Sequence, residues 1–139
     1  MNKILHHAQM TTDKEVKTIL MVDDDSDNRY LCSEILRDFG YKVIEEPDGE
    51  SALLAIQEGA RIDLVITDER MPGINGMELI SALRQVLPSV PVIMMTAYGS
   101  INTYLQALSL GAFEYVNKPV GKRELQRIIE AALHEFEKN

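Results

Sequence analysis

A buried strand that ends in a carboxylate constrains this chain more than any other stretch. Residues 64–67 are Leu, Val, Ile and Thr, Asp68 follows them directly, and Pro72 and Gly73 mark a turn a few positions later. An apolar, β-branched run bounded by turn residues is typical of an interior strand of a parallel sheet. In open α/β sheets, ligands bind at the carboxyl ends of the strands. The sequence therefore predicts that Asp68 lies at a ligand-binding edge.

Four more strand patterns alternate with helical patterns along the chain. The strands are expected at 18–22, 42–45, 91–96 and 113–116, and a helical pattern follows every strand. This alternation predicts a doubly wound α/β domain of the flavodoxin-like type, with five parallel strands and helices on both faces. The first, third and fourth strands are apolar and suit the interior, whereas the second and fifth carry charge, as edge strands can. The order 2-1-3-4-5 satisfies both conditions.

The helical periods also predict which side chains face the sheet. Cys32, the only cysteine, falls within the first helical pattern, so no intrachain disulfide can form and a small buried role is expected. The predicted inner stripes of the first and fourth helices are Leu31, Ile35 and Phe39, and Ile101, Leu105 and Leu108.

Composition excludes several classes of protein. The 139 residues fit one domain, and the net charge of -8 argues against direct nucleic-acid binding, which needs clustered Lys and Arg. No apolar run reaches membrane-spanning length and no signal-peptide core is present, so we expect a soluble, cytoplasmic protein without a membrane partner. Residues 1–16 are expected to form a flexible extension, in which His6 and His7 lack the spacing of a metal site, and 17–139 the domain. No output domain follows the last helix, which indicates a stand-alone domain or the first piece of a longer protein.

Polar side chains follow four of the predicted strands at the same edge of the sheet. They are Asp23, Asp24, Asp68, Thr96 and Lys118. Three neighbouring carboxylates repel one another unless a cation lies among them, and oxygen ligands without His or Cys favour Mg²⁺. A carboxylate nucleophile, a divalent ion, a lysine and a hydroxyl are the groups needed to transfer a phosphoryl group onto Asp68.

Other interpretations of these acidic residues meet specific obstacles. An EF-hand calcium loop starting at Asp23 would need Gly where Asn28 stands. A phosphatase of the haloacid dehalogenase type would need Thr or Val at Asp27. A flavodoxin-like cofactor binder would need a phosphate-cradling loop after the first strand, where the chain is acidic. An interaction module that is never phosphorylated remains an alternative, although all five polar residues are present.

The motifs around these residues resemble those of response-regulator receiver domains. The resemblance covers about residues 17–137 and rests on Val22-Asp23-Asp24-Asp25, Ile66-Thr67-Asp68-Glu69-Arg70-Met71-Pro72-Gly73, Met95-Thr96-Ala97 and Asn117-Lys118-Pro119. It implies that Asp68 is the phosphoacceptor in a Mg²⁺-dependent reaction, for which Mn²⁺ is an expected substitute. The implied donor is a sensor histidine kinase, a phosphotransfer protein or a small phosphodonor. The implied metal ligands are Asp23, Asp24, Asp68 and the backbone carbonyl of Arg70, and the implied phosphoryl contacts are Thr96 and Lys118.

The same resemblance implies a signalling role rather than an enzyme acting on other molecules. Such a receiver promotes only its own phosphorylation and dephosphorylation. Thr96 and Tyr115 fall at the family's switch positions, and the fourth helix, fifth strand and fifth helix form the expected docking or homodimer surface. The Lys118-Pro119 bond is expected to be cis. Asn75, where many members have Asp, is a departure in the turn after the acceptor.

Two large side chains flank the expected approach of water to the phosphoryl group. Arg70 lies two residues after the acceptor and Tyr98 two residues after the hydroxyl residue, at positions that vary within the family. A guanidinium can stack on an aromatic ring. We therefore hypothesise that Arg70 and Tyr98 together cover the phosphoryl group and lengthen its lifetime.

Overall fold

The computed structural model describes residues 15–137 of the chain. Most of the predicted extension at 1–16, including His6 and His7, lies outside the described residues. The elements are β1 (Thr18–Val22), α2 (Ser26–Asp38), β2 (Lys42–Glu46), α3 (Gly49–Gln57), β3 (Leu64–Asp68), α4 (Gly76–Val86), β4 (Val92–Thr96), α5 (Ile101–Ser109), β5 (Glu114–Asn117) and α6 (Lys122–Glu137).

The five strands form one parallel sheet in the order β2-β1-β3-β4-β5. This order confirms the predicted topology, with the apolar strands inside and the charged strands at the edges. In the register between β1 and β3, Val22 pairs with Thr67, and between β4 and β5, Thr96 pairs with Asn117. The carboxyl ends of the interior strands therefore lie level with one another, which is the arrangement that a shared site requires.

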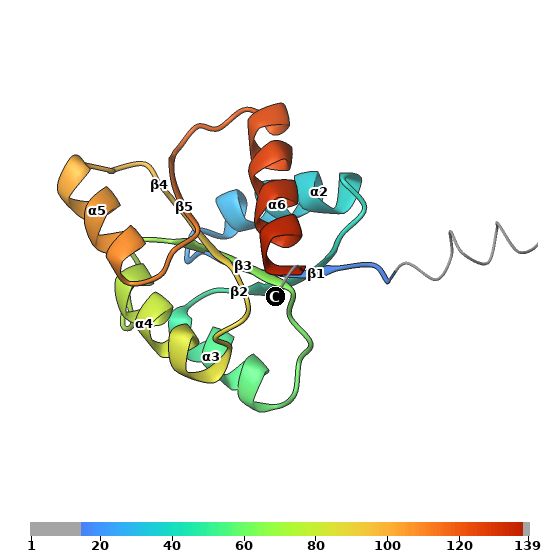
Figure 1. Cartoon of the computed structure of the whole chain (residues 1–139), viewed down its shortest axis with the longest axis horizontal. Coiled ribbons are helices and arrows are strands. Elements are labelled where there is room, and N and C mark those ends of the chain that lie inside the picture. The colour runs from blue at the N-terminus through green and yellow to red at the C-terminus, as the bar shows by residue number, and fades with distance from the viewer. Residues whose placement is uncertain (1–14, 138–139) are drawn as a thin grey trace, which may run out of the picture.

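Two apolar clusters cover the two faces of the sheet. Successive residues of a strand point to opposite faces, so that Val65 joins the cluster under α3, α4 and α5, while Leu64 and Ile66 join the one under α2 and α6. Figure 1 shows these two groups of helices on opposite sides of the sheet. Each of these three residues is 0% exposed. Because β3 is packed on both faces, the backbone position of Asp68 at its end is fixed.

Two of the predicted inner stripes are partly wrong. Leu31 of α2 is 60% exposed, and Ile101 and Leu105 of α5 are 77% and 57% exposed. The side chains that are fully buried on these helices are Ser33 and Leu36 on α2 and Ala107 on α5. Small residues permit close approach of a helix to a sheet. The helices therefore face the sheet with these residues, and some larger apolar side chains remain on the outer surface.

Side-chain caps fix the starts of four helices. Asp25, Asp48, Asn75 and Ser100 each accept a backbone N–H from the first turn of their helix. Asn75, which stands where many proteins with the resembling motifs have Asp, forms a reciprocal capping box with Glu78. Among residues 15–137, no helix has both the length and the apolar character needed to cross a membrane.

Candidate functional site

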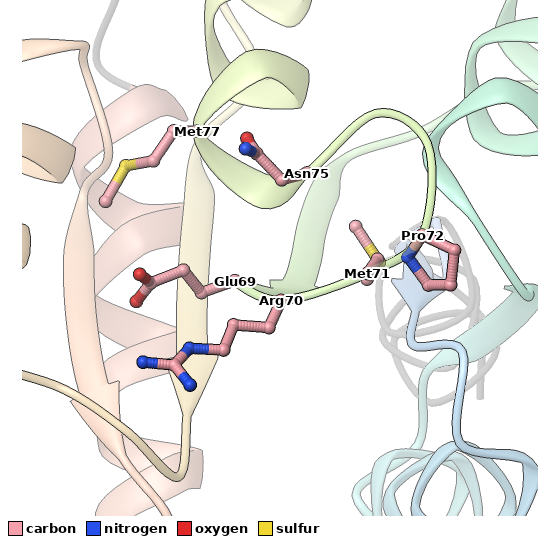
Figure 2. Close-up of a pocket in the computed structure, with 6 residues that line it drawn as sticks. All are labelled: Glu69, Arg70, Met71, Pro72, Asn75 and Met77. Carbon is pink, nitrogen blue, oxygen red and sulfur yellow. The ribbon is translucent and has the colours of Figure 1, made fainter.

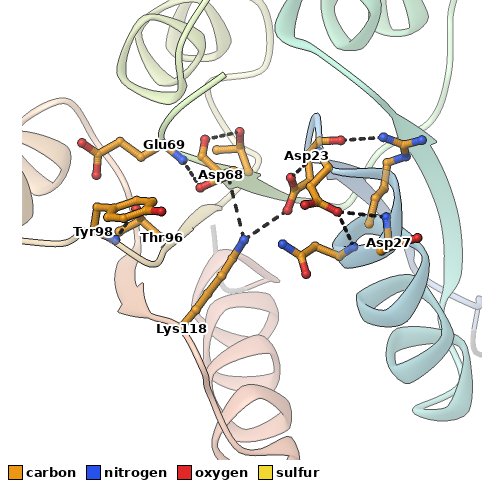
Figure 3. A network of polar contacts seen from close by, with 11 residues as sticks. Asp23, Asp27, Asp68, Glu69, Thr96, Tyr98 and Lys118 are labelled. Atoms are coloured by element: carbon orange, nitrogen blue, oxygen red, sulfur yellow. Dashed lines mark hydrogen bonds and ion pairs between the residues drawn. The ribbon is translucent and has the colours of Figure 1, made fainter. Parts of the chain in front are cut away.

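The predicted polar residues meet at the carboxyl ends of the strands. Asp23 follows β1, Asp68 ends β3, Thr96 ends β4 and Lys118 follows β5. Figure 3 shows the Lys118 side chain reaching across this edge toward both aspartates. The peptide bond between Lys118 and Pro119 is cis, as predicted. Residues separated by up to 95 positions in sequence thus form one cluster.

Lys118 is the cation that joins two of the carboxylates. Its Nζ donates a hydrogen bond to Asp23 Oδ2 at 3.1 Å and lies 3.8 Å from Asp68 Oδ2. The second Asp23 oxygen accepts the backbone N–H of Asp25 at 2.9 Å, and the Asp23 backbone oxygen accepts a hydrogen bond from Arg29 at 2.6 Å. Asp23 is 0% exposed, so this buried charge is fully engaged and its position is well defined.

Three carboxylates form a group that could hold a metal ion. Oxygen atoms of Asp23, Asp24 and Asp68 all lie within 4.8 Å of one another, with Asp23 buried, Asp68 half-buried and Asp24 exposed. Burial raises the pKa of Asp68, and the charges of Asp23 and Asp24 raise it further, whereas Lys118 and a backbone hydrogen bond lower it. An all-oxygen donor set with excess negative charge and one exposed side fits Mg²⁺, which retains waters and binds phosphate oxygens.

The loop after β3 is tightly fixed around Asp68. The Glu69 backbone N–H donates to Asp68 Oδ1 at 2.7 Å, and the Thr67 hydroxyl donates to the Asp68 carbonyl at 2.9 Å. The Gly76 N–H donates to the Glu69 carbonyl at 2.8 Å. A Cβ at Gly76 would overlap the Asp68 backbone oxygen and lie 2.9 Å from Glu69 Cα. Gly76 is therefore required for the close approach of α4 to the loop that follows β3.

Thr96 and the aromatic side chain near it lie on the opposite side of Asp68 from α2. Thr96 is 0% exposed, and its hydroxyl oxygen accepts the Tyr98 backbone N–H at 3.1 Å. The Tyr98 ring is 64% exposed and stacks under Arg70, whose Cζ lies 4.5 Å from the ring centroid. The structure thus contains the stacking on which the hypothesis of a cover depends; the effect on lifetime stays a prediction.

The loop that follows β3 lines an open pocket beside the cluster of polar residues. Figure 2 shows Glu69 and Arg70 extending to one side of this loop, away from Pro72. The lining residues are Glu69, Arg70, Met71, Pro72, Asn75 and Met77.

Tyr115 is buried and hydrogen-bonded. Only 7% of it is exposed, and its hydroxyl donates to Glu69 Oε1 at 2.7 Å. The Thr103 hydroxyl lies 2.5 Å from the Tyr115 hydroxyl oxygen. Its ring contacts Tyr104 edge to face, with 6.0 Å between centroids. Sequence reasoning placed Tyr115 at a switch position but missed Glu69 and Thr103. The sequence showed only that a charged residue, Glu69, follows Asp68 where the chain enters a loop. This did not indicate that its side chain would contact Tyr115.

Cys32 is half-buried and packs against the cluster under α2 and α6. Burial raises the pKa of its thiol to about 11, so the group is a neutral thiol at physiological pH. This agrees with the predicted apolar packing role.

Comparisons with known proteins give a consistent result. The family model described as "Response regulator receiver domain" matches residues 19–130. The chain is 38% identical over 115 residues to the transcriptional regulatory protein ZraR of Klebsiella oxytoca, covering 83% of this chain and 26% of that protein. It is 44% identical over 115 residues to the transcriptional regulatory protein CpxR of Escherichia coli K12, covering 83% of this chain and 48% of that protein. The chain thus spans about a quarter of the length of the first of these relatives and about half of the second.

Solved structures agree with the sequence relatives. A response regulator receiver domain protein (CheY-like) from Methanospirillum hungatei superimposes with a TM-score of 0.84 at 33% identity, covering 89% of this chain and 98% of that one. A response regulator receiver domain protein from Clostridium thermocellum gives a TM-score of 0.82 at 30% identity, covering 86% of this chain and 96% of that one.

Proposed function

Because the chain belongs to the response regulator receiver domain family, whose general function is phosphorylation on Asp, we propose that Asp68 is the residue that accepts the phosphoryl group. The single observation that carries this proposal is the position of Asp68 at the carboxyl end of β3, 3.8 Å from Lys118 Nζ. It belongs to a group of three carboxylates within 4.8 Å. Asp23 has the same lysine and acidic neighbours, but its side chain is only 1% exposed, whereas 17% of the Asp68 side chain is accessible to an incoming donor.

The residues around Asp68 would divide the work of the reaction. An Asp68 oxygen forms the new bond to phosphorus while the bond from phosphorus to the donor breaks, so the attacking and leaving atoms must lie in line. The carboxylates of Asp23, Asp24 and Asp68 and the Arg70 carbonyl would hold Mg²⁺, with Mn²⁺ as a substitute. When bound, the ion neutralises charge on the phosphoryl oxygens.

Two further side chains would bind the transferred group. The Lys118 amine would contact a phosphoryl oxygen while retaining its hydrogen bond to Asp23, since an ammonium carries three donors. The Thr96 hydroxyl, which is at the end of β4, would donate to another phosphoryl oxygen. These roles make the chain a signalling module that promotes only its own phosphorylation and dephosphorylation, rather than an enzyme acting on other substrates.

We propose that α5, β5 and α6 form the output surface. Large exposed apolar side chains on α5 support this, because Ile101, Tyr104 and Leu105 are 77%, 39% and 57% exposed. Phosphorylation would draw the Thr96 hydroxyl toward the phosphoryl group and favour the inward orientation of Tyr115. This would shift the population of the surface toward a form that docks to a partner or forms a homodimer. The phosphoryl donor would be a sensor histidine kinase or a phosphotransfer protein in the cytoplasm.

The remaining partners follow from charge and length. With a net charge of -8, this domain is not itself proposed to bind nucleic acid. ZraR and CpxR are named as transcriptional regulators and are longer than this chain, so any DNA binding would belong to another part of a whole protein. Within the chain, residues 1–16 are proposed as an extension and 17–139 as the receiver.

We also propose that Arg70 and Tyr98 set the lifetime of the phosphorylated state. Their stacked side chains, 4.5 Å from Cζ to ring centroid, lie on the loops that follow β3 and β4. Water that hydrolyses an aspartyl phosphate must approach phosphorus opposite the Asp68 oxygen. A stacked guanidinium and ring would obstruct that path and so slow hydrolysis.

Incubation with acetyl phosphate tests the central proposal. With Mg²⁺, the intact-protein mass should increase by one phosphoryl group, and peptide mapping after reductive trapping should place it on Asp68. Asp68→Asn or removal of the ion by chelation should abolish the increase, and Asp38→Asn is the matched control. Phosphate on Ser26 or Thr67, or transfer without a divalent ion, would overturn the mechanism. No transfer under any condition would instead favour a receiver-like interaction module.

A further inference from the structure

We propose that Glu69 is a positioning residue that holds the Tyr115 hydroxyl inward and thereby fixes the start of α5. Its backbone and its side chain face different partners. The Glu69 N–H donates to Asp68 Oδ1 at 2.7 Å, whereas Glu69 Oε1 accepts the Tyr115 hydroxyl at 2.7 Å. One residue therefore contacts both the acceptor and the buried tyrosine of β5.

The direction of the hydrogen bonds follows from the number of protons. A phenol has one proton, and Tyr115 gives it to the Glu69 carboxylate, which can only accept. The 2.5 Å contact between Tyr115 and Thr103 is then donated by the Thr103 hydroxyl. Another acceptor for this single proton, the Ser100 carbonyl oxygen, is farther away at 3.2 Å. The chain of donors runs from Thr103 of α5 through Tyr115 of β5 to Glu69 in the loop after β3. Hydrogen bonds to a charged acceptor are stronger than neutral ones, and bonds in a chain polarise one another.

The chain of hydrogen bonds begins in the N-terminal cap of α5. Ser100 is the N-cap, its side chain accepts the Thr103 N–H, and the Thr103 hydroxyl accepts the Ser100 N–H at 3.0 Å. Glu or Gln usually fills the third position of a capping box. Here Thr103 fills it with a short hydroxyl that also reaches Tyr115. The cap and the tyrosine therefore share one oxygen atom, and moving Tyr115 would disturb the first turn of α5.

Among the described residues, Glu69 supplies the carboxylate that is hydrogen-bonded to the Tyr115 hydroxyl, and the Thr103 hydroxyl is the other side-chain partner. Tyr115 is 7% exposed, so most of its side chain is removed from water. Glu114 contacts only its backbone, because Glu114 Oε1 accepts the Tyr115 N–H at 3.0 Å. Burial raises the pKa of Tyr115, and the hydrogen bond to Glu69 and the negative charge of Glu69 raise it further, while Thr103 lowers it. This protonated, donating phenol is the form that the geometry requires.

The positioning role can be tested on unphosphorylated protein carrying ¹³C-labelled tyrosine. Glu69→Ala should move the NMR ring signals of Tyr115 and of its edge-to-face neighbour Tyr104, with the inward population falling on the order of tenfold relative to the outward one. Glu69→Gln keeps an acceptor oxygen and should restore most of the wild-type signal. Glu114→Ala removes a nearby carboxylate that does not touch the hydroxyl and should leave the ring signals in place. Tyr115→Phe assigns the signals.

A double-mutant cycle gives a second measurement. If Glu69 acts through the hydroxyl, the effects of Glu69→Ala and Tyr115→Phe on the free energy of unfolding should be less than additive. Ring signals unchanged in Glu69→Ala, or strictly additive effects, would overturn the positioning role. Its relevance to signalling rests on the proposed function, which is tested separately by adding beryllofluoride to the wild type. Unmoved amide signals in α5 and β5 would then refute the proposed output without altering the result for Glu69.

Discussion

Replacing Asp68 by Asn should stabilise the fold in the absence of divalent ions. The Asp68 side chain lies with Asp23 and Asp24 in a group of carboxylates within 4.8 Å, and Lys118 is 3.8 Å away. The neutral amide would remove two repulsions and one attraction, while Lys118 keeps its 3.1 Å hydrogen bond to Asp23. We therefore expect the charge of Asp68 to lower the stability of the metal-free fold.

The size of this effect follows from Coulomb's law. At 4.8 Å, one pair of charges interacts by roughly 1–3.5 kcal/mol for an effective dielectric constant of about 80 to 20. Two repulsions and one attraction leave about one net repulsion, and exposure of Asp24 shifts the value to the lower part of this range. We expect Asp68→Asn to raise the free energy of unfolding by about 1–2 kcal/mol, or the melting temperature by about 3–8 °C.

The pH dependence of this difference provides an internal check. Burial and the neighbouring carboxylates raise the pKa of Asp68 above its ordinary value of 3.8. The native state thus binds the proton more tightly than the unfolded chain, so wild-type stability falls as pH rises through the interval above 3.8. The amide of the Asp68→Asn variant does not titrate, so the advantage of the variant should be small near pH 3 and develop fully by pH 7.

Urea unfolding of both proteins in EDTA, from pH 3 to pH 7, measures the difference. Asp38→Asn, an exposed change of equal charge, is the control and should have little effect. Adding Mg²⁺ should stabilise the wild type more than the variant, since a ligand of the native state raises stability by mass action. An Asp68→Asn protein less stable than the wild type at pH 7 in EDTA, or a difference independent of pH, would refute the electrostatic reasoning.

Four further substitutions test other parts of the site. Tyr98→Ala and Arg70→Ala should each speed loss of phosphate from purified phosphoprotein, with a double mutant that gains less than the sum; slower or unchanged decay in both would contradict a cover. Lys118→Ala should slow phosphorylation by acetyl phosphate at least tenfold and leave Asp23 as a buried charge without its cation, and unfolding at pH 7 should show a loss of roughly 3–5 kcal/mol; wild-type rate and stability would exclude the ion pair. Gly76→Ala should destabilise by roughly 1–3 kcal/mol in thermal unfolding, because its Cβ would overlap the Asp68 backbone oxygen; a neutral effect would show that α4 moves freely.

The strand-end residues could be predicted because strands have few degrees of freedom. Once residues 64–67 were assigned to an interior parallel strand, Asp68 had to lie at its carboxyl end, and the same logic placed Thr96 and Lys118. Helical stripes were less reliable. Helical period alone does not tell which of two adjacent stripes faces the sheet. The predicted stripe with Leu105 faces outward, because the small side chain of Ala107 lets the other stripe pack closer to the sheet.

The hydrogen-bonded chain at Glu69 could not be predicted from the sequence. It depends on the rotamers of three side chains from three separate elements, and on a loop conformation that directs Glu69 toward β5. Neither propensity nor spacing determines these. The stacking of Arg70 on Tyr98 was foreseen only because the resemblance placed both residues beside the expected path of water to the phosphoryl group. Strand ends are thus predictable at the level of residues, whereas contacts between loops require coordinates.

The hydrogen bond between Asp23 and Lys118 joins residues 95 positions apart. During synthesis, a nascent chain that has emerged only through β4 carries all three carboxylates, yet lacks the amine that holds two of them together. Under the proposed function, the site is complete only once β5 pairs with β4 and brings Lys118 beside Asp23 and Asp68. Under the proposed function, a truncated or proteolytically clipped molecule without that segment would present the three carboxylates without Lys118, and we expect it not to compete with intact molecules for the phosphoryl donor. The proposed site is therefore complete only in a chain that includes β5 and Lys118.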